Sequence, residues 1–367
     1  MNNIRKRIKV FIPPAARIIL IISILCGIIH FAAVISPAFA DFFNRTVSAF
    51  FRALLSYITA LIPFSVGELI FISLPISAVA LIVYSFYVTK RNSIRATRYM
   101  FSLIAVISLL YSTFVLTFAT AYHGTPLDKK LKLDRRPVSA EELYNTALWL
   151  AEEVNGLTDE ISYTFGSSSK MPYSYREMNR RLLDAYDSFC EEHSFIQRLK
   201  SRIKPIVFSD PLAYTHISGV YTYFTGEANI NMIFPDYTLP FTAAHELAHQ
   251  RGIAREDEAN FVAFLICIKS EDPYIRYSGY LNLYEYVSSA LYHADRELFS
   301  SVSSSLSGRA RYEMIAYNEF FNKYRDSTIS TISGAINDTF LKLQGTPGSK
   351  SYGMVVDLAV AYYNNTP

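Results

Sequence analysis

Three long apolar stretches dominate the first third of the chain. Residues 18–36, 69–88 and 101–121 contain no Asp, Glu, Lys or Arg over 19, 20 and 21 consecutive positions. An α-helix needs about 20 residues to cross a hydrocarbon core about 30 Å thick, and a helix in a soluble core rarely stays uncharged for so long. We therefore predict three transmembrane α-helices, which make residues 1–122 a multi-pass anchor in a lipid bilayer.

Charged residues are distributed unevenly, and their distribution orients the predicted anchor. Residues 1–122 carry 11 Lys or Arg and 2 acidic residues, whereas residues 123–367 carry 24 Lys or Arg and 30 acidic residues. Short cytoplasmic segments of membrane proteins are enriched in Lys and Arg. Basic residues precede the first stretch and separate the second from the third: Arg5, Lys6, Arg7, Lys9 and Arg17, then Lys90, Arg91, Arg95 and Arg98. The segment between the first two stretches has only Arg45 and Arg52, so we predict a cytoplasmic N-terminus and an extracytoplasmic domain at residues 123–367.

Composition limits the class and the partners of that domain. The chain is 51% hydrophobic and 15% aromatic, which excludes intrinsic disorder. A surface that binds nucleic acid needs positive charge. Because acidic residues exceed basic ones in residues 123–367, nucleic acid is not an expected partner. A further basic cluster at residues 129–136 does not reverse the predicted orientation, since the charge rule weakens at the start of a long domain.

Three features of the anchor have alternative interpretations. Ala38, Phe39 and Ala40 have the form of a signal-peptidase site, but the apolar stretch before them is longer than a signal core. We therefore favour a retained first helix over a cleaved one. Apolar residues recur at helical spacing in residues 47–61, which predicts a helix that lies in the membrane interface or packs outside the bundle. His30 is expected to be neutral and bonded to a neighbouring helix rather than functional.

Residues 123–367 are predicted to form one mainly helical domain with a small sheet. Ser139 followed by Glu142 is a capping box that begins a helix. Strand-forming residues concentrate at 217–234, and most later segments have helical spacing. Cys190 and Cys267 are the cysteines of this domain, and their spacing does not decide whether they pair. The oligomeric state is likewise left open.

A short motif in this domain carries the chemistry of a metal site. His245, Glu246 and His249 form the pattern H-E-x-x-H. On a helix, residues four apart project from the same side, so both imidazoles can bind one zinc ion. Glu246 lies about 100° around the helix from His245, which keeps its carboxylate off the metal but close to a water molecule there. We predict that His245 and His249 are zinc ligands and that Glu246 is the catalytic base.

A second helix, predicted to start near residue 255, is expected to complete the site. Gly252 can end the first helix in the left-handed conformation. A catalytic zinc ion needs a third protein ligand and one open position. Glu256 is placed to be this ligand, with Glu258 as the alternative, and Asn260 is predicted to hydrogen-bond a ligand histidine. Ordinary roles for Glu256 in the first turn and for Asn260 as a buried polar group stay open.

The string H-E-L-A-H-Q-R-G-I-A-R-E-D-E-A-N-F at residues 245–261 resembles the motif of gluzincin metallopeptidases, including the ImmA/IrrE-like group. In those families the Glu of an E-x-x-A-D or E-x-x-A-N element binds zinc, which implies that role for Glu256. With three preceding spans, the string also resembles a bacterial membrane-protein family known as a domain of unknown function, over most of the chain. Only six residues separate His249 from Glu256, closer to the metzincin spacing, so Glu258 stays the alternative. Residues 226–232 resemble by position the strand that pairs with substrate in zincins, and a core strand without this role is an equal alternative.

These observations predict a membrane-anchored zinc metallopeptidase with a zincin-like domain, which hydrolyses peptides or proteins outside the cytoplasm. The alternatives are a non-catalytic zincin-like sensor or binding module at the cell surface, and a metal-dependent hydrolase of another amide. Glu246 favours an enzyme, because a structural zinc ion needs no base. A residue that stabilises the oxyanion is also expected, and the sequence does not select among several candidates: Tyr214, His216, Tyr223, Tyr277, Tyr280 and Tyr284.

Overall fold

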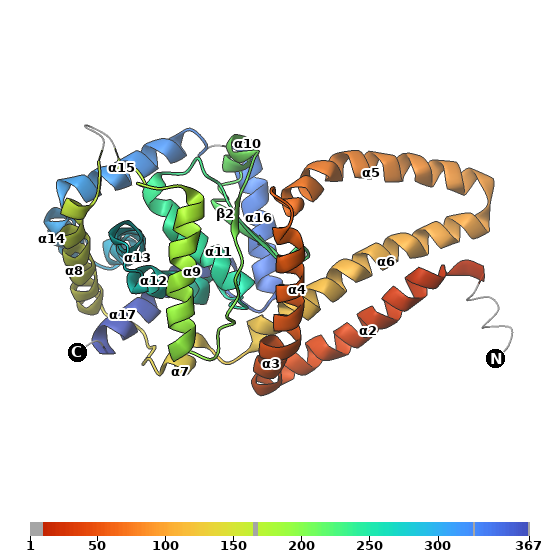
Figure 1. Ribbon diagram of the computed structural model, residues 1–367, viewed down its shortest axis with the longest axis horizontal. Coiled ribbons are helices and arrows are strands. Elements are labelled where there is room, and N and C mark those ends of the chain that lie inside the picture. Colours follow the sequence, from red (N-terminus) through yellow and green to blue (C-terminus); the bar gives the residue numbers. More distant parts are fainter. Residues whose placement is uncertain (1–9, 164–167, 326, 366–367) are drawn as a thin grey trace.

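The computed structural model describes residues 10–163, 168–325 and 327–365. Figure 1 shows an elongated molecule, with a globular part at one end and long helices that extend from it. The predicted cytoplasmic residues Arg5, Lys6, Arg7 and Lys9 lie outside the described residues.

Three helices in the described part of the chain are long and apolar enough to cross a membrane, which indicates membrane insertion: α2 (Pro14–Ile35), α5 (Val66–Arg91) and α6 (Ser93–Thr117). They match the predicted stretches except at the end of the third. Helix α6 stops at Thr117, and Phe118 leads into the 3-10 helix η2 (Ala119–His123). The ring of Phe118 lies 5.3 Å from that of Tyr221 and 5.7 Å from that of His249, so the predicted end of this span contacts the globular part instead.

Two predictions about single side chains can be compared with the structure. His30 Nδ1 lies 3.1 Å from the hydroxyl of Tyr111 on α6, so the predicted contact with a neighbouring helix is present. Cys26, Cys190 and Cys267 are free thiols, so Cys190 and Cys267 do not form a disulfide.

Helix α4 (Ala49–Ala60) reverses the usual arrangement of polar and apolar side chains. Its buried residues are Arg52, Ser56 and Thr59, whereas Phe50 is 62% exposed and Ile58 is 53% exposed. A helix that packs its polar side on the protein and turns its apolar side outward is suited to a lipid surface. The helix predicted at residues 47–61 is thus present, after α3 (Pro37–Phe43) and η1 (Asn44–Ser48).

A buried ion pair joins the spanning helices to the globular part. The carboxylate of Glu227 accepts hydrogen bonds from the backbone N–H groups of Val66, at 3.1 Å, and Gly67, at 2.8 Å, in the first turn of α5. It also pairs with the ammonium of Lys204, which donates to the carbonyl of Thr59 at 2.8 Å. A carboxylate at a helix N-terminus is stabilised by the unpaired N–H groups and the helix dipole, so Glu227 fixes the first turn of α5 to the sheet.

Replacing Glu227 with Ala is expected to lower the free energy of unfolding by about 3 kcal/mol or more, because the charge of Lys204 stays buried without its partner. Denaturant unfolding in detergent micelles, followed by the fluorescence of Trp149, measures the change. The variant Glu227→Leu/Lys204→Met, which buries no charge at this point, is expected to lose less. Equal midpoints for wild type and Glu227→Ala would show that the ion pair does not stabilise this joint.

The globular part consists mainly of helices that pack around α13 (Pro273–Ala294), in a core formed by buried residues of most of these elements. The capping box predicted at Ser139 and Glu142 is present at the start of α8. The remaining α-helices are α7 (Leu127–Leu131), α8 (Ala140–Leu157), α9 (Tyr175–Glu192), α10 (Ser209–Ala213), α11 (Leu239–Gln250), α12 (Glu256–Lys269), α14 (Arg296–Ser305), α15 (Gly308–Asn322), α16 (Thr328–Leu343) and α17 (Val355–Asn365). Short 3-10 helices are η3 (Thr158–Glu160), η4 (Asp236–Thr238) and η5 (Gly348–Met354).

A small sheet packs against α11. Within the described residues it has three strands in the order β1-β3-β2: β1 (Ile203–Pro205), β3 (Glu227–Ile230) and β2 (Gly219–Thr222). Strand β3 is parallel to β1 and antiparallel to β2. The strand-forming stretch at 217–234 therefore folds into β2 and β3, with Gly226 in the left-handed conformation (φ +69°) at their turn.

The position of β3 decides between the two alternatives for residues 226–232. Strand β3 is hydrogen-bonded on both sides and has no free edge, so it is a core strand and does not pair with substrate. Strand β2 lies at the edge of the sheet instead. The pairing order in the sheet, which the sequence does not give, distinguishes an edge strand from a central one.

Candidate metal centre

Helix α11 carries the H-E-x-x-H motif and ends where the chain must reverse. Pro240 lies in its first turn, where its missing N–H breaks no helical hydrogen bond. The helix ends at Gln250, and Gly252 adopts φ +91°, while Ile253 N–H donates to the carbonyl of Ala248 at 3.1 Å. A Cβ at Gly252 would lie 2.7 Å from the Arg52 guanidinium. Both the conformation and the space therefore require glycine here.

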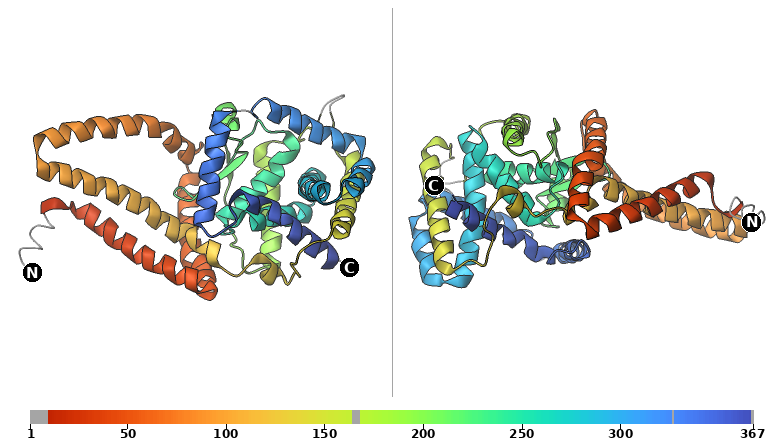
Figure 2. Two further views of the ribbon diagram at one scale, coloured as in Figure 1. Left: turned by 180° about the vertical axis from the view of Figure 1, so that it is seen from behind. Right: turned by 90° about the horizontal axis from the view of Figure 1, so that it is seen from below.

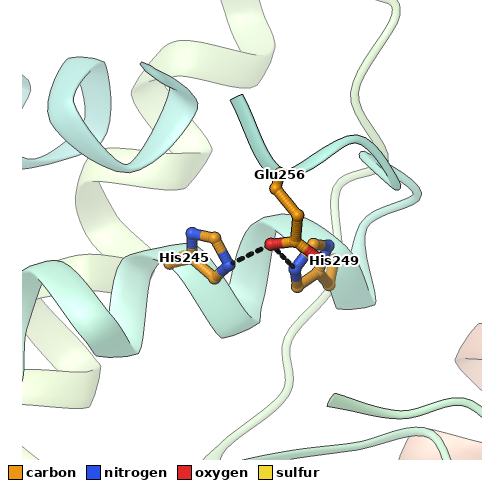
Figure 3. A group of neighbouring side chains, drawn as sticks. All are labelled: His245, His249 and Glu256. Carbon is orange, nitrogen blue, oxygen red and sulfur yellow. Dashed lines mark ion pairs between the residues drawn. The ribbon is translucent and has the colours of Figure 1, made fainter. Parts of the chain in front are cut away.

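The reversal brings the first turn of α12 against the histidine side of α11. Glu256 Oε2 lies 3.2 Å from His245 Nε2 and 3.4 Å from His249 Nε2, and Figure 3 shows both imidazoles directed at this carboxylate. All three side chains are buried. The structure thus gathers two nitrogen atoms and one oxygen atom, from residues that the sequence singled out, within 4.8 Å of one another.

Hydrogen bonding sets the form of one imidazole. His249 Nδ1 lies 2.7 Å from the carbonyl oxygen of Ile253, so Nδ1–H donates to this carbonyl. The lone pair of a neutral His249 then lies on Nε2, which faces Glu256. A backbone carbonyl that fixes the tautomer and the ring in this way is typical of metal-binding histidines.

The charges of the cluster favour a cation at its centre. Burial raises the pKa of the Glu256 carboxyl, but the neighbouring imidazoles of His249 and His245 outweigh burial and hold it well below the usual range. For His249, burial lowers the pKa, and the Glu256 carboxylate outweighs that effect and raises it to about 9. A carboxylate that raises the pKa of a neighbouring imidazole in this way would also attract a divalent cation.

The residues present fit a zinc ion. Two imidazole nitrogen atoms and one carboxylate oxygen form a donor set of catalytic zinc sites, which leave a further position open. His245, His249 and Glu256 also line a cavity of about 570 Å³, so an open position would face it.

Glu246 lies beside this cluster, between α11 and the edge strand. Its Oε2 is buried and has no hydrogen-bond partner within the described residues, and the backbone of Tyr221 in β2 hydrogen-bonds the carboxylate. A Cβ at Gly219 would lie 2.6 Å from Glu246 Oε1, so β2 can approach only because this residue is glycine. Burial raises the pKa of Glu246, against the lowering effect of His245 and His249. The result is a carboxylate that holds a proton more readily than an exposed Glu does.

The cavity has largely aromatic walls. They come from the globular part and from the membrane helices, since Phe71 of α5 and Phe118 after α6 both contribute. The Phe118 ring lies 5.7 Å from the His249 ring, edge to face. The other aromatic residues of the lining are Tyr122, Tyr221, Tyr223, Phe224, Phe234, Phe241, Tyr286, Tyr317, Phe340 and Tyr352.

The lining also separates the candidates for oxyanion stabilisation. His216 and Tyr223 line the cavity, whereas Tyr214, Tyr277, Tyr280 and Tyr284 are not part of its described lining. Sequence reasoning missed Tyr286 on α13 and Tyr352 in η5, which do line it. With 27 tyrosines in the chain, residue type alone gave no signal, and both residues reach the site only through packing of distant elements.

Two predicted site residues have other partners. Glu258 Oε1 accepts hydrogen bonds from Leu127 N–H and Arg255 Nη1, both at 2.9 Å, so its carboxylate is already paired away from the histidines. Asn260 lines the cavity, but its amide donates to the hydroxyl of Tyr286 and the carbonyl of Tyr352, both at 3.4 Å. No described hydrogen bond joins Asn260 to His245 or His249. The carbonyl of Ile253 occupies the position that we predicted for Asn260.

Metal content separates the two candidate ligands. Glu256→Ala is expected to weaken zinc binding by more than about 100-fold, the upper end of the loss seen when only a supporting residue is removed. Glu258→Ala is expected to keep stoichiometric zinc, because its carboxylate pairs with Arg255. Zinc per protein after dialysis, measured by elemental analysis, tests both variants. Zinc loss in Glu258→Ala together with retention in Glu256→Ala would exchange their roles.

Comparison with known proteins gives a family without a function. The family model described as "Protein of unknown function (DUF3810)" matches residues 43–360. No curated protein and no solved structure shows a significant match to the chain. The match includes the candidate metal centre, α4, α5 and α6.

Proposed function

The chain belongs to the DUF3810 family, and because that membership carries no activity, we propose from its site that it is a membrane-anchored zinc metallopeptidase with a zincin-like domain. The observation that carries the proposal is the arrangement around Glu246. A buried carboxylate oxygen without a hydrogen-bond partner among the described residues adjoins a two-histidine, one-carboxylate cluster. A purely structural metal site has no need of such a base.

Three residues would hold the metal and one would move the proton. His245 and His249, through Nε2, and Glu256, through its carboxylate, would bind zinc. Zinc in such a site polarises a carbonyl group and lowers the pKa of water. Glu246 would take a proton from the attacking water molecule as the water oxygen bonds to the peptide carbonyl carbon. The same carboxyl group would then give this proton to the amine nitrogen as the C–N bond breaks, so that Glu246 ends in its starting form.

The edge strand supports a peptide as the substrate. Strand β2 pairs with β3 on one side, and Gly219 to Thr222 line the cavity. An extended peptide can add to a free strand edge through backbone hydrogen bonds, which recognise any sequence. Such a peptide would pass Glu246, which lies against Gly219.

We place the catalytic domain outside the cytoplasm. Lys90, Arg95 and Arg98 lie around the junction of α5 and α6, at the far end of these helices from the globular part (Figure 1). Basic residues at this end favour its retention in the cytoplasm, which would put the opposite end and the site on the external side.

A test uses the full-length protein in detergent micelles. We expect zinc near one ion per chain, cleavage of internal bonds in a random peptide library, loss of cleavage on chelation and recovery when zinc is added. Zinc-loaded protein that cleaves no peptide would favour the sensor or binding module. Protein that binds no zinc at all would overturn the metal centre.

A further inference from the structure

Helix α16 carries an apolar stripe that the described residues leave uncovered. Ile329 and Ile332 are each 54% exposed, Ile336 is 66% exposed and Leu343 is 78% exposed. Their spacing of three, four and seven residues places them along one side of the helix. The neighbouring exposed flank is polar, with Thr331 exposed and a Lys342–Asp338 ion pair of 2.6 Å. One flank of α16 thus suits water, and the other suits an apolar surrounding.

Helix α16 packs against a spanning helix beside the stripe. Phe340 of α16 lies between Ile336 and Leu343 along the chain, and its ring is 5.9 Å from the ring of Phe114 in α6. Phe114 belongs to a membrane-length helix. Figure 1, and the view from behind in Figure 2, show α16 at the end of the globular part from which the spanning helices leave, where α4 also lies. Lipid that surrounds α6 would therefore also reach the stripe of α16.

The same helix forms part of the wall of the metal site. Ser333, Gly334, Asn337 and Phe340 of α16 line the cavity. Phe71 of the spanning helix α5 lines it as well, with its ring 6.0 Å from Phe224 in the β2–β3 turn. The wall of the cavity thus includes α16, which has an apolar exposed stripe, and Phe71, which belongs to a membrane-length helix. Part of this wall would therefore lie near the level of the bilayer surface.

We propose that the stripe of α16 lies in the lipid leaflet next to the globular part, and that the site cleaves peptide segments directly adjoining a membrane anchor. The substrate class rests on the proposed peptidase function, whereas the placement of α16 does not. Exposure of the four apolar side chains to water is unfavourable, and lipid would bury them. Helix α4, which lies at the same end of the globular part (Figure 1), also exposes apolar side chains, among them Phe50 and Ile58.

Cysteine labelling tests the placement of α16. Ile336→Cys and Thr331→Cys are made in full-length protein that carries Cys190→Ser, reconstituted in phosphatidylcholine vesicles and treated with a membrane-impermeant maleimide. The labelling of each variant is divided by its labelling after denaturation. The Cys190→Ser protein without an added cysteine gives the background labelling. Both positions lie on one helix, so their ratio does not depend on the orientation of the protein in the vesicle. We expect at least about tenfold less labelling at position 336, whose thiol lipid would cover. Equal labelling would overturn the placement.

Peptide hydrolysis tests the substrate class in the same vesicles. In one random peptide library, a palmitoyl anchor is joined directly to the random segment. In a second library, a long Gly-Ser spacer separates the same anchor from the random segment. Because the anchor is the same, both libraries reach the same surface concentration. A site at the bilayer surface is expected to cleave the first about tenfold faster, because the spacer dilutes the reactive segment. Ile332→Asp/Ile336→Asp is expected to lose this preference and keep its zinc, whereas Thr331→Asp/Ala335→Asp on the polar flank keeps both.

The outcomes separate the two proposals. Equal cleavage of both libraries, or faster cleavage of the spaced one, would overturn the substrate class and leave the peptidase standing. If no library, acylated or soluble, is cleaved in a Glu246-dependent way, the proposed function fails and the substrate class with it. The labelling ratio still decides where α16 lies.

Discussion

Glu246→Gln is expected to reduce peptide hydrolysis by about a thousandfold, within the range for loss of a general base, while zinc content stays unchanged. The substitution keeps the shape of the side chain but removes its ability to take a proton from water. His245, His249 and Glu256 form the cluster without Glu246, so the substitution removes no proposed zinc ligand. Initial rates on a cleavable library peptide and zinc per chain, measured on the same preparation, give both quantities.

The charge state of Glu246 also predicts how this activity depends on pH. Burial raises the pKa of Glu246, whereas the positive charge of a zinc ion beside it would lower the same pKa. Wild-type activity is therefore expected to fall as the pH is lowered through the pKa of this carboxyl group. The residual activity of Glu246→Gln should lack the contribution of this carboxyl group.

A matched control distinguishes this effect from general damage to the domain. Glu285 is also an inward-facing carboxyl group of the globular part, hydrogen-bonded to Tyr237 at 2.7 Å, and it is not among the described residues that line the cavity. Glu285→Gln is expected to keep most of the activity. Equal losses in Glu246→Gln and Glu285→Gln, or zinc loss in Glu246→Gln, would contradict the role of Glu246 as base.

The parts of the site that lie on one helix could be predicted from the sequence. His245 and His249 share a side of α11 because residues four apart on a helix always do. The role of Glu256 could not be predicted from helix geometry alone, since its position depends on the turn at Gly252. The resemblance of residues 245–261 to gluzincins indicated this role. For Asn260 the structure favours the alternative of a buried polar group, because the carbonyl of Ile253 already accepts from His249 and the Asn260 amide donates to Tyr286 and Tyr352.

The walls of the cavity could not be predicted, because they depend on contacts between distant segments. Phe71, Phe340 and Tyr352 come from α5, α16 and η5, and no local spacing relates them. The end of the third apolar stretch was misplaced for a similar reason. Residues 118–121 are as apolar as a span, but Phe118 and Ala119 are buried in a cluster that joins α2 and α6 to the globular part. Hydropathy records only that they avoid water, and it does not separate these two surroundings.

Zinc is expected to raise the Tm of the wild-type protein by several degrees, and His249→Ala is expected to remove both the shift and the stoichiometric zinc. A ligand that binds only the folded state adds RT ln(1 + [L]/Kd) to its stability, about 2.7 kcal/mol at a free concentration 100 times the Kd. Loss of His249 takes away the imidazole whose Nδ1 is fixed by the carbonyl of Ile253, and leaves His245 and Glu256 as a two-residue site.

His216→Ala is the control, since His216 lines the same cavity but its Nε2 donates to the carbonyl of Tyr324 at 2.9 Å. This variant should keep the zinc-dependent shift. A shift that persists in His249→Ala, or disappears equally in His216→Ala, would place the metal elsewhere. Because the measurement needs no turnover, it tests the metal centre even if the chain is a binding module rather than a peptidase.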